Sequence, residues 1–510
     1  MKILSKDQIY AADKATEQAE AIPSFNLMER AGGYAFQYIH QRLQGQPVQI
    51  KIFCGIGNNG GDGLVIARNL VENGYSVKTY IVNYSENRSE DFLNALEELK
   101  KKTTKWPEVL KSVADFPEIA PEDLVVDCIF GIGLNRPAAV WVQQLFRLIN
   151  ESSAYTLAID IPSGMAIDQI IPDSEVVRAT VVLTFQTPKL AFFLPQSGKY
   201  INNWEVLDIG LDRNYLNSVK TKAQLIGKTE AQQMYRPRQK FSHKGTYGHA
   251  LLIAGSYGKM GAAVLSNKAC LSSGAGLVTA YSTRQGLPIL QTSIPEVMVV
   301  TDRHTGDFIE EIQFDIEPDV IGIGPGLGTH KSTQKAFEEF LKVNKTPLVL
   351  DADALNMLSE NKALLDLLPK YSILTPHPKE LERLIGEWKD DFEKLEKAEA
   401  FSAKYDCILV CKDAHTIVVF EGNYYVNTSG NPGMATGGSG DVLTGVLTGL
   451  VAQGYDPLTA AIFGSFIHGR AADIAINHTG YEGLTAGVIV EFLGQAFLDL
   501  FHEPEKQPQK

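Results

Sequence analysis

The sequence predicts an α/β protein of two domains, an N-terminal doubly wound sheet followed by a larger α/β domain. Three observations support this fold class. The chain has 510 residues, which is too long for one ordinary domain. From residue 48 onward, short and nearly continuous apolar runs alternate with helical patterns, as expected for parallel strands buried on both faces. The alternation breaks in a polar stretch around 212–245 and then resumes, which indicates a domain boundary.

The first domain is placed at residues 1–215. A helix is expected in the segment GLVIARNLVENG (63–74), because its apolar residues recur at helical spacing. Strands that alternate with helices in this way form a sheet with helices on both faces. The strands are expected in the apolar runs 48–55, 75–82, 124–131, 155–162 and 179–185.

The second domain is placed at residues 222–505. The segment GAAVLSNKACLSSGAG (261–276) has the pattern of a helix between two strands. A second complete alternation implies that this half of the chain has a hydrophobic core of its own. The strands are expected at 249–255, 319–324, 347–353, 372–376, 407–412 and 416–420.

Composition and charge exclude several classes of protein. Apolar residues make up 44% of the chain and charged residues 21%, which is normal for a soluble globular protein. The net charge is −13 and no run rich in Lys or Arg occurs, so nucleic acid is not expected as a partner. No apolar run is long enough for a membrane span, and the N-terminus lacks the apolar core of a signal peptide. Five cysteines without a CxxC pair fit a reducing compartment, so we expect a cytoplasmic protein. A homo-oligomer is expected as well.

A glycine-rich segment, GIGNNGGDG (55–63), follows the first apolar run and precedes the first helix. It contains the spacing G-x-G-x-x-G at Gly55, Gly57 and Gly60. Between a strand and a helix, such a segment can present backbone N–H groups to a phosphate. The ordinary dinucleotide fingerprint also has an acid at the end of the next strand, but here that strand ends in Asn83. A tight turn without a ligand is the alternative, because glycine is useful in any sharp turn.

Two further predicted strands of this domain carry an aspartate near their carboxyl ends. Asp127 lies in VVDCIFGIGLNRP (125–137), and Asp160 lies in LAIDIPSG (157–164). Buried acids are rare unless they are paired or bind a ligand. Because both belong to the same predicted sheet as the glycine-rich segment, they indicate a ligand crevice at the carboxyl ends of its strands.

On these residues the first domain resembles the NAD(P)H-hydrate epimerases, the YjeF N-terminal family with its Rossmann-like sheet. The matching stretches are GNNGGDG (57–63), Asp127 with GIGLNRP (131–137), DIPSG (160–164) and LMERAG (27–32). The resemblance implies binding of hydrated NADH or NADPH (NADHX and NADPHX) and interconversion of their R and S epimers, with Asp160 as a catalytic residue at the reacting end. It also implies a potassium ion at Asn59, Asp127 and Ser163, and hard oxygen ligands suit such a cation. The implied substrate-binding residues are Asn58, Asn59, Gly60, Gly61, Asp62, Gly131, Ile132, Gly133, Leu134, Asn135, Arg136, Pro137 and Asp160.

The second domain has polar or glycine-rich segments after several of its predicted strands. DVIGIGPGLGTHKS (319–332) is not a Walker A loop, because it lacks the Gly-Lys-Ser/Thr ending, and a plain turn is its alternative. The stretch LDADALN offers Asp351 and Asp353 after another strand. His377 lies between two prolines that stiffen its turn, and Lys412 ends a strand as a candidate phosphate contact. Ordinary solvated loop side chains are the alternative for both residues.

The segment NPGMATGGSGDVLTG (431–445) places glycines directly before Asp441 and an apolar helical pattern. Helix N-termini expose unpaired N–H groups and partial positive charge, and glycines let these donors approach phosphate oxygens. A carboxylate beside such a site can accept the proton of a hydroxyl that receives a phosphoryl group. Asp441 as a simple N-cap is the alternative, although a cap does not require the preceding GGSG.

With these stretches the second domain resembles ribokinase-like proteins and, more narrowly, the ADP/ATP-dependent NAD(P)H-hydrate dehydratases. The matching stretches are HKGTYGHALLIAGS (243–256), GAAVLS (261–266), GIGPGLG (322–328), TPHPKE (375–380), CKDAHT (411–416) and NPGMATGGSGDVLTG (431–445). The chain departs from the family pattern at Lys379, Cys411 and Asp413, which flank the key residues rather than replace them. The resemblance implies that Ala263, Gly326, His377 and the catalytic Asp441 line the hydrate site. It implies a nucleotide site made of Lys412, Asp413, Ala414, His415, Thr416 and Gly440.

Together, the two resemblances imply a bifunctional metabolite repair enzyme, an isomerase fused to a lyase. The first domain would epimerise NAD(P)HX at C6, and the second would phosphorylate the C6 hydroxyl of the S epimer with ADP or ATP. AMP or ADP is released, and loss of phosphate then restores NAD(P)H. Mg²⁺ is expected with the nucleotide and K⁺ with the epimerase domain. The alternative is a ribokinase-type vitamin or sugar kinase, whose product keeps its phosphate, fused to a non-catalytic dinucleotide-binding module.

Overall fold

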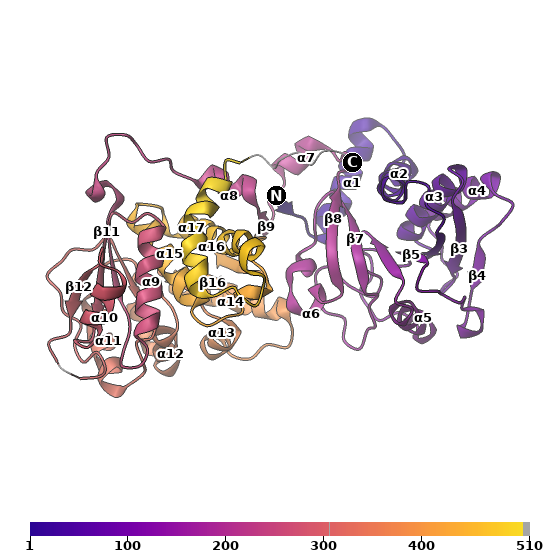
Figure 1. Cartoon of the computed structure of the whole chain (residues 1–510). Coiled ribbons are helices and arrows are strands. Elements are labelled where there is room, and N and C mark those ends of the chain that lie inside the picture. Colours follow the sequence, from indigo (N-terminus) through magenta and orange to yellow (C-terminus); the bar gives the residue numbers. More distant parts are fainter. Residues whose placement is uncertain (305, 503–510) are drawn as a thin grey trace. The chain divides into compact units, whose positions relative to one another are not determined.

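The computed structural model describes residues 1–304 and 306–502, which form two compact units (Figure 1). The N-terminal unit contains Lys2–Lys222 together with Asp390–Phe392. The C-terminal unit contains Met1, Ala223–Lys389 and the chain from Glu393 onward. Both units are α/β, which confirms the fold class that the sequence predicts.

The N-terminal unit alternates strands and helices along most of its length. Its strands are β1 (Lys2–Ile3), β2 (Gln49–Cys54), β3 (Ser76–Val82), β4 (Glu108–Leu110), β5 (Leu124–Cys128), β6 (Tyr155–Ile159), β7 (Ala179–Phe185) and β8 (Ile201–Leu207). Its helices are α1 (Lys6–Glu20), α2 (Ser24–Leu43), α3 (Asn58–Glu72), α4 (Glu90–Lys102), α5 (Val140–Glu151), α6 (Pro195–Gly198) and α7 (Arg213–Ser218), with 3₁₀ turns η1 (Val113–Asp115) and η2 (Leu190–Phe193). The sheet has the order β4-β3-β2-β5-β6-β7-β8, and each neighbouring pair runs parallel.

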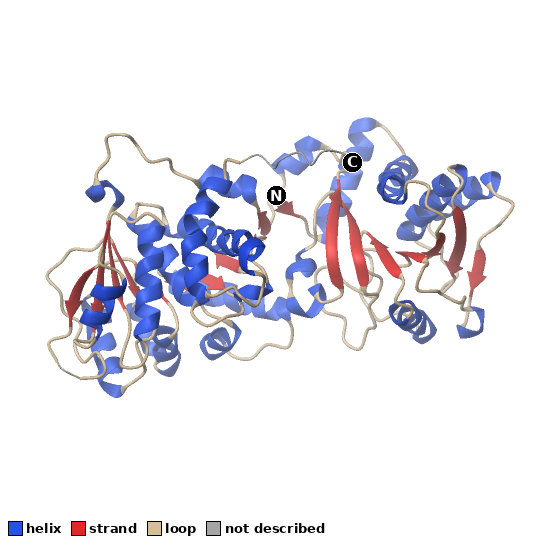
Figure 2. Ribbon diagram, viewed as in Figure 1, coloured by secondary structure: helices blue, strands red, loops and turns tan. Residues whose placement is uncertain are grey.

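Apolar side chains of this sheet alternate between two hydrophobic clusters. Ile50 and Ile52 of β2 pack with residues of α2, α3 and α4. Phe53, the next-to-last residue of the same strand, packs with Phe146 and other residues of α5. Successive side chains of a strand point to opposite faces, so the sheet separates the two clusters. Figure 2 shows helices on both sides of the sheet, and the doubly wound arrangement expected from the sequence is confirmed.

The C-terminal unit repeats this alternation on a larger scale. Its strands are β9 (Ala223–Ile226), β10 (His249–Ile253), β11 (Leu277–Ser282), β12 (Met298–Thr301), β13 (Val320–Ile323), β14 (Leu348–Leu350), β15 (Ile373–Leu374), β16 (Ile408–Cys411), β17 (Ile417–Phe420) and β18 (Asn423–Asn427). Its helices are α8 (Lys228–Met234), α9 (Met260–Ser272), α10 (Gly286–Ser293), α11 (Lys331–Val343), α12 (Asp353–Glu360), α13 (Pro378–Ile385), α14 (Asp391–Tyr405), α15 (Ser439–Ala452), α16 (Pro457–Thr479) and α17 (Ala486–Asp499), with 3₁₀ turns η3 (Lys244–Tyr247), η4 (Lys362–Leu367) and η5 (Pro432–Met434).

Its strands follow the order β9-β18-β17-β16-β15-β14-β13-β10-β11-β12. From β12 to β16 each neighbouring pair is parallel, and β16, β17 and β18 form an antiparallel meander. In both sheets the chain order reverses beside one strand. β2 lies between β3 and β5, and β10 lies between β11 and β13. Ligands of open α/β sheets bind beyond the carboxyl ends of the strands at such a switch point.

The main core of the C-terminal unit lies between the sheet and helices α9, α15, α16 and α17. Leu252 of β10 packs in one cluster with Val446 of α15 and Phe463 of α16. Glycine allows α15 to approach α9 closely, because a Cβ at Gly445 would lie 2.1 Å from the backbone oxygen of Ser266. This contact fixes the position of α15, whose first turn carries the glycine-rich segment predicted from the sequence.

Each apolar run predicted as a strand contains one, but other strands were missed. The missed ones include β8 and β12, which lie at sheet edges and carry several exposed or half-buried side chains rather than a continuous apolar run. The first predicted helix, placed at 63–74, begins earlier, at Asn58. Within the described residues, no helix is both long and apolar enough to cross a membrane.

Candidate active sites

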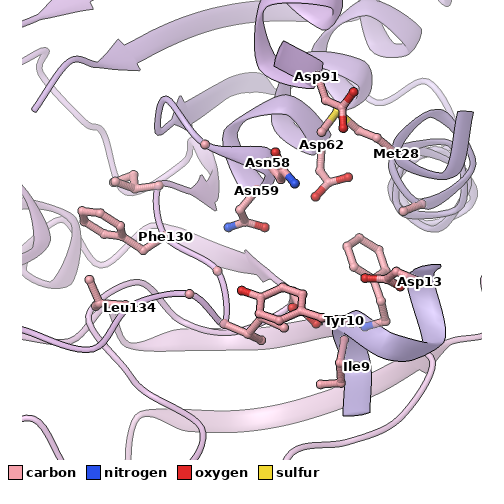
Figure 3. Close-up of a pocket in the computed structure, with 18 of the residues that line it drawn as sticks. Ile9, Tyr10, Asp13, Met28, Asn58, Asn59, Asp62, Asp91, Phe130 and Leu134 are labelled. Carbon is pink, nitrogen blue, oxygen red and sulfur yellow. Dashed lines mark hydrogen bonds between the residues drawn. The ribbon is translucent and has the colours of Figure 1, made fainter. Parts of the chain in front are cut away.

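The N-terminal unit has a pocket with a volume of about 870 Å³ at the switch point of its sheet (Figure 3). Segments that follow β2, β5, β6 and β7 line it, together with residues of α1, α2 and α3. Most of the substrate-binding residues predicted from the sequence meet here, although they come from distant parts of the chain. They are Asn58, Asn59, Asp62, Gly131, Ile132, Gly133, Leu134, Asn135, Arg136, Pro137 and Asp160.

Gly60 and Gly61, the remaining predicted binding residues, are not among those that line the pocket. Because α3 begins at Asn58, the glycine-rich segment forms the first turns of a helix rather than a loop. A Cβ at Gly60 would lie 1.9 Å from the backbone oxygen of Gly55, and one at Gly61 would lie 2.5 Å from a methionine sulfur. These glycines therefore allow close packing around the first turn of α3, which presents Asn58 and Asn59 to the pocket.

Asn59 is the clearest sign that the pocket binds a polar group. Its side chain is buried, and neither its amide nitrogen nor its amide oxygen has a hydrogen-bond partner in the described part of the chain. Figure 3 shows this amide between Phe130 and Tyr10. Leaving a buried amide unpaired is unfavourable by about 1–3 kcal/mol. We conclude that the site is arranged for a partner that the chain itself does not supply.

Asp127 and Ser163 are fully buried and bind each other rather than lining the pocket. The Ser163 hydroxyl donates to Oδ1 of Asp127 at 2.5 Å, and the Ser163 N–H donates to Oδ2 at 2.8 Å. Burial raises the pKa of Asp127 to about 6, although these hydrogen bonds oppose the shift. The Ser163 hydroxyl also accepts from the N–H of Phe130, and Gly131 next to it packs against Asn59. The three predicted potassium ligands therefore lie on adjoining segments.

Asp160 follows β6 and lines the pocket in a left-handed backbone conformation, with φ of 63°. Its carboxylate accepts from the ammonium of Lys189 at 2.9 Å and from the N–H of Phe185 at 3.3 Å. Lys189 is only 1% exposed and also donates to the backbone oxygens of Thr187 and Phe185. The lysine therefore fixes the orientation of the aspartate, and no sequence motif had indicated Lys189.

Two more carboxyl groups face this space. Burial and the nearby Asp160 raise the pKa of Asp13, on α1, to about 7. Burial, Asp160 and Asp13 hold the pKa of Asp62 well above its ordinary range. Burial and the same two aspartates also raise the pKa of Tyr10. Several acids that share one buried space are a common feature of active sites.

In the C-terminal unit, Asp351 is the centre of a second polar site. It follows β14, and its side chain is 2% exposed. The ammonium of Lys412, directly after β16, donates to its Oδ1 at 2.8 Å, and the hydroxyl of Thr444 on α15 donates to its Oδ2 at 2.9 Å. Burial alone would raise the pKa of Asp351, but Lys412 and the hydroxyl donors hold it below its ordinary value. Sequence reasoning singled out this acid but assigned it no role, and it missed Thr444.

Asp441 lies in the first turn of α15 rather than at its N-cap. The cap is Gly438, with φ of 93°, and no side chain of the described residues caps the helix. Burial and the neighbouring Asp351 raise the pKa of Asp441 to about 6, while Lys412 lowers it. A Cβ at Gly440 would lie 3.2 Å from the ammonium of Lys412, so glycine leaves this cation close to the helix N-terminus. The alternative of Asp441 as a simple N-cap is therefore wrong.

His377 is the N-cap of α13 rather than a free loop side chain. Its Nδ1 accepts from the N–H groups of Lys379 and Glu380, at 3.1 and 3.4 Å. Burial and Lys412 lower its pKa, so the ring is neutral with its proton on Nε2. Glu380 lies next to this ring, with its Oε1 3.4 Å from Nε2 of His377. Burial raises the pKa of Glu380 to about 7. The histidine can therefore donate one hydrogen bond from a fixed ring.

The other predicted dehydratase residues belong to the same unit of the structure. Gly326 follows β13 in a left-handed conformation, and a Cβ there would lie 2.6 Å from the backbone oxygen of Lys259. Ala263 on α9 is fully buried. Within the stretch after Lys412, burial lowers the pKa of His415. Asp413, Ala414 and Thr416 complete this predicted nucleotide-binding stretch.

His468, on α16, was not predicted from the sequence. It is 6% exposed, and its Nε2 has no hydrogen-bond partner among the described residues. Burial and the nearby Lys412 lower its pKa to about 4, while the backbone of Ser439 opposes the shift. A neutral histidine therefore lies behind the first turn of α15. A single histidine in a long apolar helix carries no local signal of such a contact.

Two largely parallel sheets, each with glycine-rich segments and buried carboxyl groups near the carboxyl ends of its strands, define a two-unit α/β enzyme. Comparison with known proteins agrees with this class. A family described as "YjeF-related protein N-terminus" matches residues 24–191, and the family described as "NAD(P)H-hydrate dehydratase" matches residues 250–493. The chain belongs to the family of bifunctional NAD(P)H-hydrate repair enzymes.

One such relative shows the extent of the match. The chain is 35% identical over 520 residues to the bifunctional NAD(P)H-hydrate repair enzyme Nnr of Moorella thermoacetica. The match covers 99% of this chain and 98% of that relative. A solved ribokinase-like superfamily protein from Enterococcus faecalis is 28% identical to this chain, with a TM-score of 0.48. That match covers 55% of this chain and 98% of the Enterococcus faecalis protein. The ADP/ATP-dependent NAD(P)H-hydrate dehydratase of Bacillus subtilis, co-crystallised with ATP and Mg²⁺, is 29% identical and covers 54% of this chain and 97% of its own, with a TM-score of 0.47.

Proposed function

We propose that the chain repairs hydrated NADH and NADPH in two steps at two separate sites. The pocket around Asn59 and Asp160 interconverts the R and S epimers of the hydrate. The site around Asp351, Lys412 and Asp441 then dehydrates the S epimer with ADP or ATP, releasing AMP or ADP and phosphate. Family membership over the full length of the chain supports both activities. The observation that carries the second step is the Asp441 carboxyl group, set beside an ammonium at a helix N-terminus.

The epimerase domain is assigned to residues 1–215 and the dehydratase domain to residues 222–505. In the first, the predicted residues 131–137 and the first turn of α3 hold the substrate, and Asp160 contacts its reacting ring. Potassium is assigned to Asn59, Asp127 and Ser163. The unpaired amide of Asn59 and the buried oxygens of Asp127 and Ser163 fit a hard cation, because alkali ions prefer oxygen ligands. When bound, such an ion would add positive charge next to the Asn59 side chain in the wall of the pocket.

In the dehydratase site, Asp441 accepts the proton of the C6 hydroxyl as that oxygen attacks the terminal phosphoryl group. Its pKa of about 6 leaves it ionised at neutral pH and still close to the pH at which a base works well. Lys412 and the N–H groups of the first turn of α15 stabilise the transferred group. His377 donates from Nε2 to the substrate. Loss of phosphate from C6, with a proton from C5, restores the double bond of NAD(P)H.

The stretch from Lys412 to Thr416, together with Gly440, is assigned to the nucleotide. Magnesium accompanies the nucleotide and supplies charge neutralisation for the phosphates. The co-crystallisation of the Bacillus subtilis dehydratase with ATP and Mg²⁺ is in line with this assignment. A homo-oligomer is part of the proposal, and its test is the mass of the native particle in solution.

The alternative, a vitamin or sugar kinase fused to a non-catalytic module, is not favoured by the full-length match. One experiment separates the two functions. The protein is incubated with a mixture of R and S NADHX, Mg²⁺ and ADP, while NADH absorbance and free phosphate are followed. A repair enzyme converts both epimers to NADH with one phosphate released per NADH. A kinase would instead accumulate a phosphorylated product, and an inactive first domain would leave the R epimer to its slow spontaneous conversion.

A further inference from the structure

The pocket of the N-terminal unit has more acidic than basic side chains, although the proposed substrate is an anionic dinucleotide. The acids that line it are Asp13, Glu17, Asp62, Asp91 and Asp160, and the bases are Arg136 and Lys189. Phosphate groups are repelled by such a surplus of carboxyl groups. The acids must therefore serve a part of the ligand that is neutral or becomes positively charged. The neutral parts of a hydrated nicotinamide dinucleotide are its riboses, its adenine and its hydrated ring, and the hydrated ring is the part that reacts and can become positive in the reaction at C6.

Asp13 is the acid best placed to exchange a proton with this ring. Figure 3 shows Asp13 of α1 and Asp62 of α3 pointing into the same part of the pocket. Burial and Asp160 bring the pKa of Asp13 to about 7, against the opposing effect of Lys189, and Glu17 raises it further. Burial and the neighbouring acids Asp160 and Asp13 raise the pKa of Asp62 well above its ordinary range. Of the two, Asp13 is the one that gives and takes a proton near neutral pH.

We infer that Asp13 is the acid–base catalyst of the epimerisation, which proceeds through a cationic N1=C6 iminium form of the hydrated ring. This inference rests on the substrate placement proposed above. The unpaired Asn59 amide in the same pocket is an independent sign that a polar ligand binds here. Sequence motifs did not identify Asp13, because it lies on α1, far along the chain from the glycine-rich segment.

The reaction balances without any further reactant. The C6 hydroxyl takes the proton of the Asp13 carboxylic acid while the C6–O bond breaks, and water leaves with the bonding electrons. The lone pair of N1 forms the N1=C6 double bond, so the ring becomes positive and Asp13 becomes a carboxylate. Water then adds to the opposite face of C6, the double-bond pair returns to N1, and the surplus proton returns to the Asp13 carboxylate. The product differs from the substrate only in the configuration at C6.

The surrounding groups fit a positive ring. The Asp160 carboxylate, oriented by Lys189, and the Asp13 carboxylate formed in the step place negative charge beside the iminium. Fixed charges that oppose a developing charge are the usual source of transition-state stabilisation. Tyr10, also on α1, lines the same space as an uncharged phenol. The surplus of acids thus matches the chemistry of the ring rather than the charge of the phosphates.

The test uses the full-length protein, pure S-NADHX and no ADP, with the two epimers separated by chromatography over time. Asp13→Asn is expected to slow epimerisation by about 10²–10⁴-fold, the usual worth of general acid–base catalysis. In the wild type, the rate should fall as pH rises through about 7, because Asp13 loses its proton, and this fall should be absent in the variant. Asp13→Glu should recover part of the rate. Asp7→Asn, an exposed aspartate on the same helix, is the matched control and should behave as wild type.

A second measurement tests the bond that breaks. In water enriched in heavy oxygen, wild-type turnover should place the heavy isotope on C6 of the epimerised product. An unlabelled product would overturn the iminium route, because opening of the C6–N1 bond retains the original oxygen. An Asp13→Asn variant that epimerises within about threefold of wild type would overturn the role of Asp13. A wild type that does not epimerise at all would contradict the proposed function itself. Dehydration of S-NADHX with ADP, unchanged in each variant, confirms that the variants are folded.

Discussion

The Lys412 ammonium donates a 2.8 Å hydrogen bond to Oδ1 of Asp351, whose side chain is 2% exposed. This ion pair joins the end of β16 to the end of β14, directly beside the first turn of α15. Removing one partner of a buried pair leaves an uncompensated charge and costs about 3–5 kcal/mol. We therefore expect the pair to stabilise the fold as well as to prepare the nucleotide site.

Lys412→Met is predicted to lower the free energy of unfolding by about 3–5 kcal/mol, measured by urea denaturation. Adding Asp351→Asn removes the unpaired charge, so the double variant should regain most of this loss while remaining unable to dehydrate S-NADHX. Lys342→Met breaks an exposed pair with Glu338 and should change stability by less than about 1 kcal/mol. A Lys412→Met protein as stable as wild type would show that the pair does not stabilise the fold.

Asp441→Asn is predicted to slow ADP-dependent dehydration by about 10²–10⁴-fold, because the C6 hydroxyl loses the acceptor of its proton. Nucleotide affinity should be retained or increased, since a negative charge beside the phosphates is removed. Epimerisation should be unchanged and serves as the internal control for folding. If the variant dehydrates within about threefold of wild type, Asp441 is not the base.

Asp441→Asn should also stabilise the protein at neutral pH. Folding raises the pKa of this acid to about 6. Ionisation of Asp441 therefore opposes folding once the pH exceeds the ordinary pKa of an aspartate. The penalty is absent below about pH 4, grows as pH rises toward 6 and is constant above it. Unfolding experiments should show a gain of about 1–3 kcal/mol at neutral pH that vanishes in acid. A gain of the same size at both pH values would indicate a different cause.

Asp160→Asn is predicted to stop epimerisation while leaving dehydration of the S epimer intact, because the two steps use different units. Some loss of stability is expected as well, since Lys189 stays buried opposite a neutral amide. Asp168→Asn, an exposed aspartate a few residues along the same segment, is the control and should keep both activities. An unchanged R-to-S rate in Asp160→Asn would remove Asp160 from the mechanism.

Asn59→Leu tests the proposed potassium site without using activity. Wild-type protein should melt at a higher temperature in potassium chloride than in choline chloride of equal ionic strength, because the ion binds only the folded state. The variant should lose this difference. Its stability in choline chloride should not fall, because the amide that it removes has no partner among the described residues. An equal potassium effect in both proteins would place the ion elsewhere.

The sequence predicted the strands of the interior well and those of the edges poorly. Interior strands such as β5 and β16 are nearly continuous apolar runs because both of their faces are covered. Edge strands such as β8 alternate irregularly between half-buried and exposed residues, so no periodic pattern marks them. Motif reasoning found residues such as Asp160 and Asp441 for a similar reason, since each stands in a short stretch that also contains glycine.

The partners of these residues could not be found in the same way. Lys189 lies 29 residues after Asp160, and Asp13 lies on a helix that precedes the whole sheet. Neither has a local pattern, because what brings them to the pocket is the packing of elements that are distant in sequence. The sequence also left open whether His377 is solvated, and only the structure shows that its Nδ1 caps α13. Such roles follow from three-dimensional contacts rather than from spacing.

The crowding around Gly55 determines how natural variants of this protein should be interpreted. A Cβ at Gly55 would lie 1.9 Å from the backbone oxygen of Ile129, and one at Gly60 would lie equally close to the backbone oxygen of Gly55. Any side chain at either position must separate β2 from β5 or move the first turn of α3. An inactivating replacement there will reduce the amount of folded protein in the cell, so it carries no information about substrate recognition. Replacements at Asn58 or Asp62, which line the pocket, are the ones that report on what the enzyme binds.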